Sequence, residues 1–466
     1  MERYLFSIDS VPSHIDNIYK DRISEFVLMC TPLSMNGIHL LTQKSVSVFD
    51  KCNGDFSIKK IVELTGYDQE YVLGVINALW QGRLIKINGE LSAQIKQKNS
   101  TRQIDVWFHI TNQCNLTCPY CYIKKSNEMM SEIVAHQAID NLANSALSHS
   151  MSEVRLKFTG GEPLLRFPFI KDLVDYSKRW RNKGVNFSFH ILTNGTLLSR
   201  QIIEYLKKEN ITISLSMDGI GENHDKLRHF KDGTGSFHRV VKAIHLLRKY
   251  DIRPYILTTV TNFNIDGLPE LTQYLLNEKL HFRFSLYREL GASERLLKSY
   301  NANIIEVLNR CYDICEVNLP EEDFSSIHQF CDIKLKKSRK RACGIGTKGV
   351  SIGHRGEIAI CQTLFHEPVG HVNKDDSLLA IRHQKQFQAD KYSIDDYEYC
   401  QNCIWRHNCA GGCPMLTKLQ YERFDTHSPY CDVFKVCIPR MIKIMGMQIL
   451  AKYLNKKGGE NEDWGT

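Results

Sequence analysis

Six short β-rich runs recur between residues 104 and 290, and each is followed by enough chain for a helix. The runs are Ile104 to Ile110, Val154 to Phe158, Asn186 to Leu192, Ile211 to Leu215, Pro254 to Val260 and His281 to Leu286. Strands that alternate with helices in this way lie parallel in one sheet, which is either closed into a barrel or left open. The pattern therefore predicts an α/β fold for this part of the chain.

Polar and glycine-containing groups directly follow four of these runs. They are Thr111 to Cys121, Thr159 to Pro163, Thr193 to Gly195 and Ser216 to Gly219. In TIM-like barrels, catalytic residues gather at the carboxyl ends of the strands. We therefore expect all four groups on one rim of a partial (β/α)6 barrel, rather than scattered over an open sheet.

Further units are expected on both sides of the barrel, because 466 residues exceed the roughly 150 of one typical domain. Residues 1–97 carry strand-like runs and then helical patterns, which predicts a winged-helix-like domain. Residues 291–341 are expected to form a helical connector. Residues 342–440 are rich in loops and should need metal cross-links to fold. Residues 441–466 are expected to form a C-terminal helix and a frayed tail.

The composition is that of a globular protein, with 42% hydrophobic and 24% charged residues. No stretch approaches the roughly 18 apolar residues of a membrane-spanning helix, and the N-terminus lacks the apolar core of a signal peptide. The net charge of +8 gives little support for nucleic-acid binding. We expect a cytoplasmic protein without membrane or nucleic-acid partners.

Sixteen cysteines are unusual in a cytoplasmic chain, where thiols stay reduced and usually serve metal binding or catalysis. Cys114, Cys118 and Cys121 follow the first barrel strand with the spacing C-x3-C-x2-C. When three thiolates hold a four-iron cluster, one iron has no protein ligand. An open coordination position of this kind is what a catalytic metal needs.

A second set of seven cysteines lies in the loop-rich C-terminal unit. It consists of Cys343, Cys361, Cys400, Cys403, Cys409, Cys413 and Cys431. Four closely spaced cysteines could also hold one structural zinc ion. The cysteines that have no partner pattern are expected to be small buried hydrophobic residues; they are Cys30, Cys52, Cys311, Cys315 and Cys437.

The first cysteine triplet, Gly-Gly-Glu-Pro at 160–163 and Ser-Met-Asp-Gly at 216–219 together resemble the motifs of the radical S-adenosylmethionine (SAM) superfamily. The resemblance covers residues 104 to about 440. It implies that the open iron binds the amino and carboxylate groups of SAM, and that one electron cleaves the sulfonium to a 5′-deoxyadenosyl radical. It also implies an electron donor of the flavodoxin or ferredoxin type.

The same resemblance implies a set of SAM-binding residues. They are Tyr120, Gly160, Gly161, Glu162, Asn194, Ser216 and Arg228. The Gly-Gly-Glu group would hold the methionine ammonium, for which carbonyls and a carboxylate are natural partners. The serine and the arginine match ribose- and carboxylate-binding positions, and the tyrosine backbone would read the adenine edge. Each of these residues also has a plainer explanation. The glycines could only form a tight turn, Ser216 could cap a helix, and Arg228 could be a surface residue. An Asn-Gly turn explains Asn194 equally well.

The seven-cysteine string resembles the SPASM domain, which houses two auxiliary four-iron clusters. The resemblance implies one complete cluster on Cys400, Cys403, Cys409 and Cys431. It implies a second on Cys343, Cys361 and Cys413, which Cys331 completes unless one iron stays open for substrate. With the first triplet, the expected cofactors are three [4Fe-4S] clusters and SAM.

The first 97 residues contain the stretch FDKCNGDFSIKKIVEL, followed by a long helical pattern. This resembles the leader-recognition domains of ribosomal-peptide (RiPP) maturases, which add a peptide as a strand to an exposed sheet edge. A DNA-reading winged helix and a mere packing domain are the alternatives. The expected partner is a precursor peptide or protein.

The hypothesis is a maturase that oxidatively cross-links a precursor peptide through a thioether or carbon-carbon bond. A sulfatase maturase that makes formylglycine is less well matched, because Gln362 follows Cys361 where that group has an aspartate. A peptide epimerase and a non-catalytic iron-sulfur or zinc scaffold are further alternatives. No acid or base can be named, since Tyr287 and Glu289 cannot be distinguished from packing residues.

Overall fold

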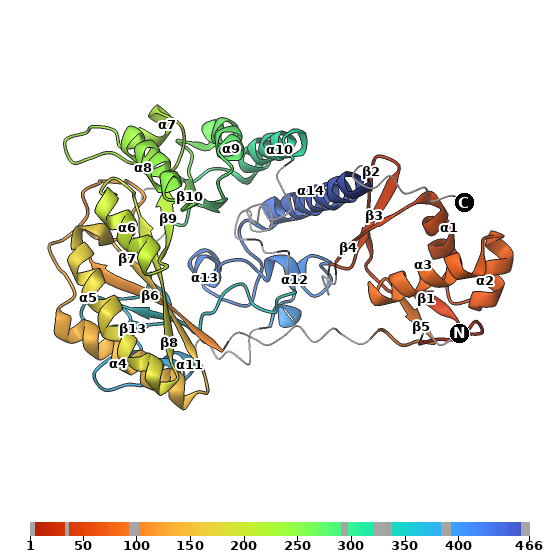
Figure 1. Ribbon diagram of the computed structural model, residues 1–466, viewed down its shortest axis with the longest axis horizontal. Coiled ribbons are helices and arrows are strands. Elements are labelled where there is room, and N and C mark those ends of the chain that lie inside the picture. Colours follow the sequence, from red (N-terminus) through yellow and green to blue (C-terminus); the bar gives the residue numbers. More distant parts are fainter. Residues whose placement is uncertain are drawn as a thin grey trace.

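The fold is seen in a computed structural model, which describes residues 5–32, 37–92, 102–289, 297–319, 333, 335, 338–383 and 393–457. Figure 1 shows a large α/β unit at one end, a small N-terminal unit at the other, and C-terminal elements between them. Within the described ranges, we find no helix with the length and apolar character needed to cross a bilayer.

Six parallel strands form the centre of the α/β unit and lie side by side in chain order. They are β6 (Gln103–Thr111), β7 (Glu153–Gly160), β8 (Asn186–Thr193), β9 (Thr212–Ser216), β10 (Tyr255–Val260) and β11 (Phe282–Leu286). The six predicted runs are thus confirmed as parallel strands, and their bounds shift by two residues or fewer. All six carboxyl ends face the same rim.

Helices between the strands cover the outer face of the sheet (Figure 1). They are α4 (Glu132–Ser148), α5 (Phe167–Ser177), α6 (Arg200–Lys208), α7 (Glu222–Asp225), α8 (Phe237–Lys249) and α9 (Leu268–Asn277), with short 3-10 turns at η1 (Pro163–Arg166), η2 (Lys178–Lys183) and η3 (Ile265–Gly267). Ser131 and Ser199 cap α4 and α6 by accepting backbone N–H bonds. Alternate residues of β7, Val154, Leu156 and Phe158, are fully buried beneath these helices.

The cysteine-rich segment extends the same sheet at its β6 edge. Strand β12 (Gly349–Ile352) pairs in parallel with β6, and β13 (Glu357–Ala359) and β14 (Gly370–His371) follow antiparallel. Its short helices are α11 (Ser377–Arg382), α12 (Arg406–Cys409) and α13 (Pro414–Tyr421), with η7 at Ile394–Asp396. The C-terminal cysteines are therefore attached to the edge of the barrel sheet.

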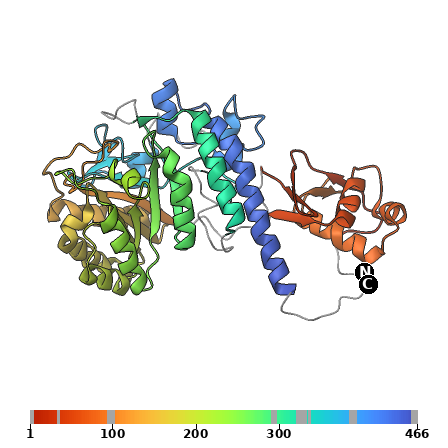
Figure 2. The ribbon, with the colours of Figure 1, turned by 90° about the horizontal axis from the view of Figure 1, so that it is seen from above.

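Two long helices pack against each other beside the barrel (Figure 2). Helix α10 (Asn301–Val317) lies in the expected connector. Helix α14 (Cys431–Lys457) begins at Cys431, not at residue 441, so it crosses the boundary expected there. Its interior Pro439 has no N–H for the helix and normally marks an end, which is why sequence reasoning placed the helix start too late.

Residues 5–32 and 37–92 of the N-terminal unit form three helices and two small sheets. Its elements are β1 (Pro12–His14), β2 (Tyr19–Ile23), β3 (Phe26–Cys30), β4 (Ile38–Leu41), α1 (Gln43–Lys51), α2 (Ile58–Thr65), α3 (Gln69–Gln81) and β5 (Ile85–Ile87). Strands β2, β3 and β4 form one antiparallel sheet, and β1 pairs with β5. Strand-like runs followed by helices were expected in residues 1–97, and β3, β4 and then α1, α2 and α3 follow that order. Strands β1 and β2 were not predicted, because their sequences lack an apolar alternation.

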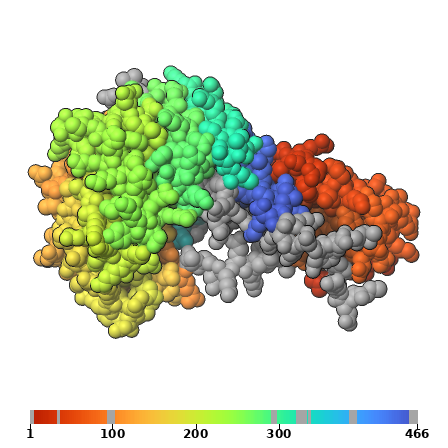
Figure 3. Space-filling model, turned by 45° about the horizontal axis from the view of Figure 1, so that its top comes forward, coloured from red at the N-terminus to blue at the C-terminus, as the bar shows by residue number. Residues whose placement is uncertain are grey.

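One face of the β2-β3-β4 sheet packs on α14. Gly446 of α14 lies so close that an added Cβ would meet Leu28 at 2.5 Å and Ile23 at 2.7 Å. The rings of Tyr19 and Trp405 also meet edge to face, with centroids 5.1 Å apart. The N-terminal unit is thus attached through the C-terminal segment, beyond α14 in the space-filling view (Figure 3).

Candidate functional site

A cavity of about 320 Å³ lies at the carboxyl ends of the barrel strands. Predicted site residues from the barrel and from the C-terminal segment line it: Cys114, Cys118, Tyr120, Cys121, Gly160, Gly161, Asn194, Ser216, Arg228, Cys361 and Cys413. Tyr287 and Gln362 line it as well. The structure thus brings the first cysteine group, the glycine motif and part of the C-terminal cysteine set to one place.

The loop that carries the first cysteine triplet is held against the Gly-Gly motif after β7. The N–H of Gly161 donates to the Thr111 carbonyl at 2.8 Å. A Cβ at Gly161 would lie 2.0 Å from the Gln113 carbonyl oxygen, so the backbones can approach only because this residue is glycine. At Gly160, φ is +135° and a Cβ would lie 2.3 Å from the Thr111 oxygen. Both glycines therefore position the cysteine loop.

A lysine lies among the three thiols. The Nζ of Lys125 donates to the Cys121 sulfur at 3.3 Å. Burial opposes the charge of Lys125, but the thiols of Cys121 and Cys114 raise its pKa above the ordinary value. Burial raises the pKa of Cys118 to about 11, while the Arg228 charge acts against this rise. Cations beside thiols favour the thiolate form, which is the form that binds metal.

Glu162, the third member of the glycine motif, is fully buried and is not among the residues that line the cavity. Its carboxylate accepts hydrogen bonds from the Thr193 hydroxyl at 2.7 Å, the Asn194 N–H at 2.8 Å and the Leu164 N–H at 3.0 Å. Burial raises its pKa, and these donors oppose the rise. In this arrangement Glu162 connects the end of β8 to the turn after β7 through hydrogen bonds. Its expected contact with the methionine ammonium of SAM stays a prediction.

Asn194 connects the β8 rim to the cysteine loop. Its Nδ2 donates to the Asn115 side-chain oxygen at 2.8 Å, and Asn115 donates to the Thr196 hydroxyl at 2.8 Å. Asn194 also accepts from the Thr196 N–H at 3.0 Å, as an Asx turn does. Asn194 therefore makes the expected turn and also contacts the residue after Cys114.

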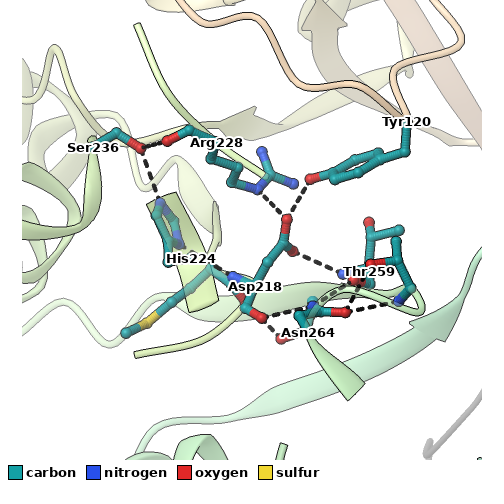
Figure 4. Close-up of polar contacts among 10 residues, drawn as sticks. Tyr120, Asp218, His224, Arg228, Ser236, Thr259 and Asn264 are labelled. Carbon is teal, nitrogen blue, oxygen red and sulfur yellow. Dashed lines mark hydrogen bonds and ion pairs between the residues drawn. The ribbon is translucent and has the colours of Figure 1, made fainter. Parts of the chain in front are cut away.

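A buried carboxylate, Asp218, contacts Tyr120 and Arg228, which both line the cavity (Figure 4). It pairs with Arg228, whose Nε lies 2.7 Å from its Oδ2, and it accepts from the Tyr120 hydroxyl and, at 2.9 Å, from the Thr259 N–H. Burial raises the pKa of Tyr120 well above its ordinary value, so the hydroxyl stays protonated. The guanidinium of Arg228 also lies 5.4 Å from the centroid of the Tyr120 ring.

Sequence reasoning missed Asp218 as a site residue. It lies inside the Ser-Met-Asp-Gly motif, two residues after Ser216, and ten residues before its partner Arg228. Arg228 could have pointed to Asp218, because an arginine that is expected in a buried site needs a carboxylate beside it.

The backbone around Asp218 is fixed by a second layer of hydrogen bonds, visible in Figure 4. The Asp218 N–H donates to His224 Nδ1 at 3.2 Å, and His224 Nε2 lies 2.9 Å from the Ser236 hydroxyl. Burial lowers the pKa of His224 to about 4, so the ring is neutral and its Nε2–H donates to Ser236. Asn264 donates to the Asp218 carbonyl at 2.6 Å. The carboxylate is therefore held rigidly.

The C-terminal cysteines fall into two neighbourhoods. Burial raises the pKa of Cys409 to about 12, and the thiols of Cys400, Cys403 and Cys431 lie close enough to contribute. Burial likewise raises the pKa of Cys343 to about 12, with contributions from Cys413 and Cys361. These are the two groups that the SPASM resemblance implies, and Cys331 lies outside the described residues.

The cysteine sets present the donor chemistry that iron-sulfur clusters require, since such clusters are held by thiolates. In the described part of the chain, no three His, Cys, Asp or Glu side chains converge closely enough to hold a single metal ion. The five cysteines expected to be inert include Cys30, Cys52, Cys311 and Cys315, whose pKa values burial raises to about 12. Buried and protonated thiols of this kind behave as small hydrophobic side chains.

Known proteins resemble this chain in sequence and in fold. Residues 108–275 match the model of the radical SAM superfamily. A serine-type anaerobic sulfatase-maturating enzyme of Bacteroides thetaiotaomicron is 33% identical over 372 residues, which cover 69% of this chain and 88% of that protein.

Two solved structures share the fold. The structure of anSMEcpe with bound AdoMet and the Cp18Cys peptide has a TM-score of 0.62 at 21% identity, covering 74% of this chain and 99% of its own. Streptococcus suis SuiB bound to the precursor peptide SuiA has a TM-score of 0.53 at 14% identity, covering 90% of this chain and 99% of its own. The chain therefore belongs to the radical SAM superfamily of enzymes, with the fold of its SPASM-type maturases.

Proposed function

We propose that the protein is a RiPP maturase that uses SAM to form a thioether or carbon-carbon cross-link in a ribosomally made precursor peptide. The observation that carries this proposal is the shared cavity: the Cys114–Cys121 loop and two C-terminal cysteines, Cys361 and Cys413, line the same space. A substrate residue bound in this cavity would therefore lie beside both cysteine groups.

Each cross-link removes two hydrogens from the peptide, and the two cysteine groups suit the two halves of that oxidation. Cys114, Cys118 and Cys121 would hold a cluster that, with SAM bound, would supply the radical chemistry needed to remove the first hydrogen atom. The second hydrogen would leave as a proton and an electron, and clusters held by the C-terminal cysteines would supply the oxidant for that electron. The bond then joins the two peptide atoms.

The residues of this chain would hold and orient the nucleotide. Ser216 and Arg228 line the cavity next to the cysteine loop, where a hydroxyl suits a ribose and a guanidinium suits a carboxylate. The tyrosine between two of the cluster cysteines, Tyr120, is fixed by Asp218. A reduced flavodoxin- or ferredoxin-like protein is the proposed electron donor.

Three clusters are proposed in total, one on the first triplet and two on the C-terminal sets. The group Cys400, Cys403, Cys409 and Cys431 has a full set of four thiols. The group Cys343, Cys361 and Cys413 needs Cys331 as a fourth ligand, or leaves one iron open beside the cavity.

The N-terminal unit supports a peptide substrate. The similarity to SuiB covers 90% of this chain, which is more than residues 98–466 alone can supply, so it extends into this unit. SuiB is bound to a precursor peptide in that structure. In this chain, β2 and β4 are the edges of a three-stranded sheet, and an edge strand can accept an added peptide strand.

Formation of formylglycine is the second candidate, because a sulfatase-maturating enzyme is among the relatives. The residue after Cys361 argues against it. Gln362 lines the cavity at the position where that group carries an aspartate, and an amide cannot accept a proton as a carboxylate base does.

The test is to incubate the reduced, cluster-loaded protein with SAM and the peptide encoded beside its gene. We expect 5′-deoxyadenosine and a peptide lighter by two hydrogens. An unchanged peptide mass with efficient 5′-deoxyadenosine formation contradicts the cross-linking proposal. Deuterium uptake from solvent at unchanged connectivity identifies an epimerase instead.

A further inference from the structure

A groove of about 610 Å³ lies on the outer side of the loop that carries the cysteine triplet, and we call it the outer groove. Cys114 and Lys125 line both this groove and the cavity at the carboxyl ends of the strands, the site cavity. The cysteine loop is therefore a wall between the two spaces. SAM and the substrate are expected to fill the site cavity, so the outer groove is the side from which another protein can approach the triplet.

A short hairpin forms a second wall of the outer groove. It covers residues 229–235, whose two ends pair as an antiparallel bridge. Phe230 forms another bridge with Leu116 of the cysteine loop, and the Thr117 N–H donates to the His229 carbonyl at 2.9 Å. The hairpin is thus attached directly to the loop that carries the cysteines, and its side chains have a fixed position relative to that loop.

The outer groove carries more positive than negative side chains. Lys125 and Lys231 line it, and the guanidinium of Arg239 lies 5.2 Å from the centroid of the Phe230 ring. Lys231 and Arg239 are exposed, and neither makes an ion pair within the described residues. Among the described lining residues the acidic one is Asp232, whose carboxylate accepts two hydrogen bonds inside its own turn, at 2.9 and 2.7 Å. The charge that remains available to a partner is positive.

Apolar side chains from two segments also line the outer groove. Leu165 of η1 is 42% exposed, and Phe230 of the hairpin is partly buried. A concave surface of this kind fits a protruding apolar edge that is surrounded by acidic residues. A flavodoxin has this combination, because the dimethylbenzene edge of its flavin lies at an acidic surface. The cluster of a ferredoxin is enclosed by its own loop and presents no such edge.

We propose that the outer groove is the docking site of the electron donor, and that this donor is a small acidic flavin protein of the flavodoxin type. The inference rests on the part of the proposed function that places a cluster on the triplet, and not on the reaction of the peptide. Lys231 and Arg239 hold the acidic surface, and Leu165 and Phe230 contact the flavin edge. In the docked complex the reduced flavin loses one electron and the cluster gains it, and no covalent bond breaks.

The first test measures binding of an acidic bacterial flavodoxin to the cluster-loaded full chain by anaerobic titration calorimetry. The variants are Lys231→Glu, Arg239→Glu, the charge-retaining Lys231→Arg and the control Lys249→Glu. Lys249 is an exposed lysine in the last turn of α8, whereas Arg239 lies in the first turn of the same helix. The control therefore reverses the same charge on the same element, away from the groove.

We expect the Kd for flavodoxin to rise tenfold or more in Lys231→Glu and in Arg239→Glu, because like charges then face each other across the interface. Lys231→Arg and Lys249→Glu should leave the Kd nearly unchanged. Higher salt should weaken binding of the wild-type protein, since these cations are exposed and are screened.

The second test follows reduction of the triplet's cluster. The electron paramagnetic resonance signal of a reduced cluster with an open iron changes when SAM is added, and this change reports that cluster alone. Reduced flavodoxin should reduce it tenfold or more slowly in Lys231→Glu and Arg239→Glu than in the wild-type protein. Dithionite is a small ion that needs no docking surface, so it should reduce the cluster at the same rate in every variant.

Wild-type rates of reduction by flavodoxin in the Lys231→Glu and Arg239→Glu proteins overturn the proposal. Slow reduction by both reductants also overturns it, because the defect then lies at the cluster. Tighter binding of an acidic ferredoxin than of flavodoxin overturns the choice of a flavin protein. Melting temperature and iron content show that each variant is folded and loaded. If docking behaves as expected but no precursor peptide becomes lighter by two hydrogens, the proposed cross-linking fails while the docking site stands.

Discussion

Asp218 and Arg228 form a buried ion pair at the carboxyl end of β9, with 2.7 Å between the Arg228 Nε and a carboxylate oxygen. The pair connects the wall of the site cavity to the loop that carries the cysteine triplet, because the same carboxylate accepts the Tyr120 hydroxyl. A single buried charge thus orients two residues that the superfamily resemblance assigns to SAM binding.

Replacing Asp218 with asparagine removes this charge at nearly constant shape. We expect the affinity for SAM to fall tenfold or more, because Arg228 loses the partner that orients it, and the free energy of unfolding to fall by about 3–5 kcal/mol, as when one partner of a buried pair is removed. Anaerobic titration calorimetry measures the first and chemical denaturation the second. Asp232→Asn, at an exposed turn, is the control and should change neither. Unchanged SAM affinity in a folded Asp218→Asn protein would show that the pair does not position the nucleotide.

Gly161 provides a second test, directed at the cysteine loop. Alanine at this position would place a Cβ 2.0 Å from the Gln113 carbonyl oxygen, and backbone must move to relieve that contact. We expect Gly161→Ala to lose about four of about twelve irons per chain, because the triplet loop shifts. Gly74→Ala, in helix α3 with open space around it, should keep its iron and melt at the same temperature or slightly higher. Full iron content in Gly161→Ala would contradict the positioning role of the glycine.

The barrel was predictable because strand and helix alternate in the sequence and the strands are strongly apolar on one face. The position of the site was predictable for the same reason, since each chemistry-bearing group directly follows a strand. The burial of Glu162 was not, because its three donors come from Thr193, Asn194 and Leu164, and only the three-dimensional pairing of β7 with β8 reveals them. Strands β1 and β2 escaped notice because short polar strands have no periodic signal. The early start of α14 was hidden by Pro439.

The C-terminal cysteines allow a matched pair of substitutions. Cys409 lies among Cys400, Cys403 and Cys431, whereas Cys437 is a buried thiol of helix α14 outside the motif. Iron analysis of Cys409→Ala should show a loss of about four irons per chain. Cys437→Ala removes only a small buried side chain, so its iron content should stay at the wild-type level. Equal iron in both variants would refute a cluster at the Cys409 group.

His190 predicts a dependence of stability on pH. Its pKa in the folded protein is about 4, below the ordinary value of 6.5, because of burial and the facing charges of Lys157 and Arg155. Below pH 6.5 the unfolded chain binds a proton that the folded chain does not, so stability is lost as the pH falls from about 6.5 towards 4. Its neutral partners Thr212 and Ser214 can also bond an amide, and His190→Gln should therefore reduce the drop in melting temperature between pH 7.5 and pH 5. An identical drop in both proteins would contradict the shift.

The central claim is that the thiols of Cys114, Cys118 and Cys121 hold iron with one position left open for SAM. The direct measurement is 5′-deoxyadenosine formation by a variant with all three cysteines replaced by alanine, after reduction and with SAM present. The account predicts that cleavage of SAM is lost while about eight irons per chain remain on the C-terminal cysteines. SAM cleavage at the wild-type rate in this variant would contradict the account.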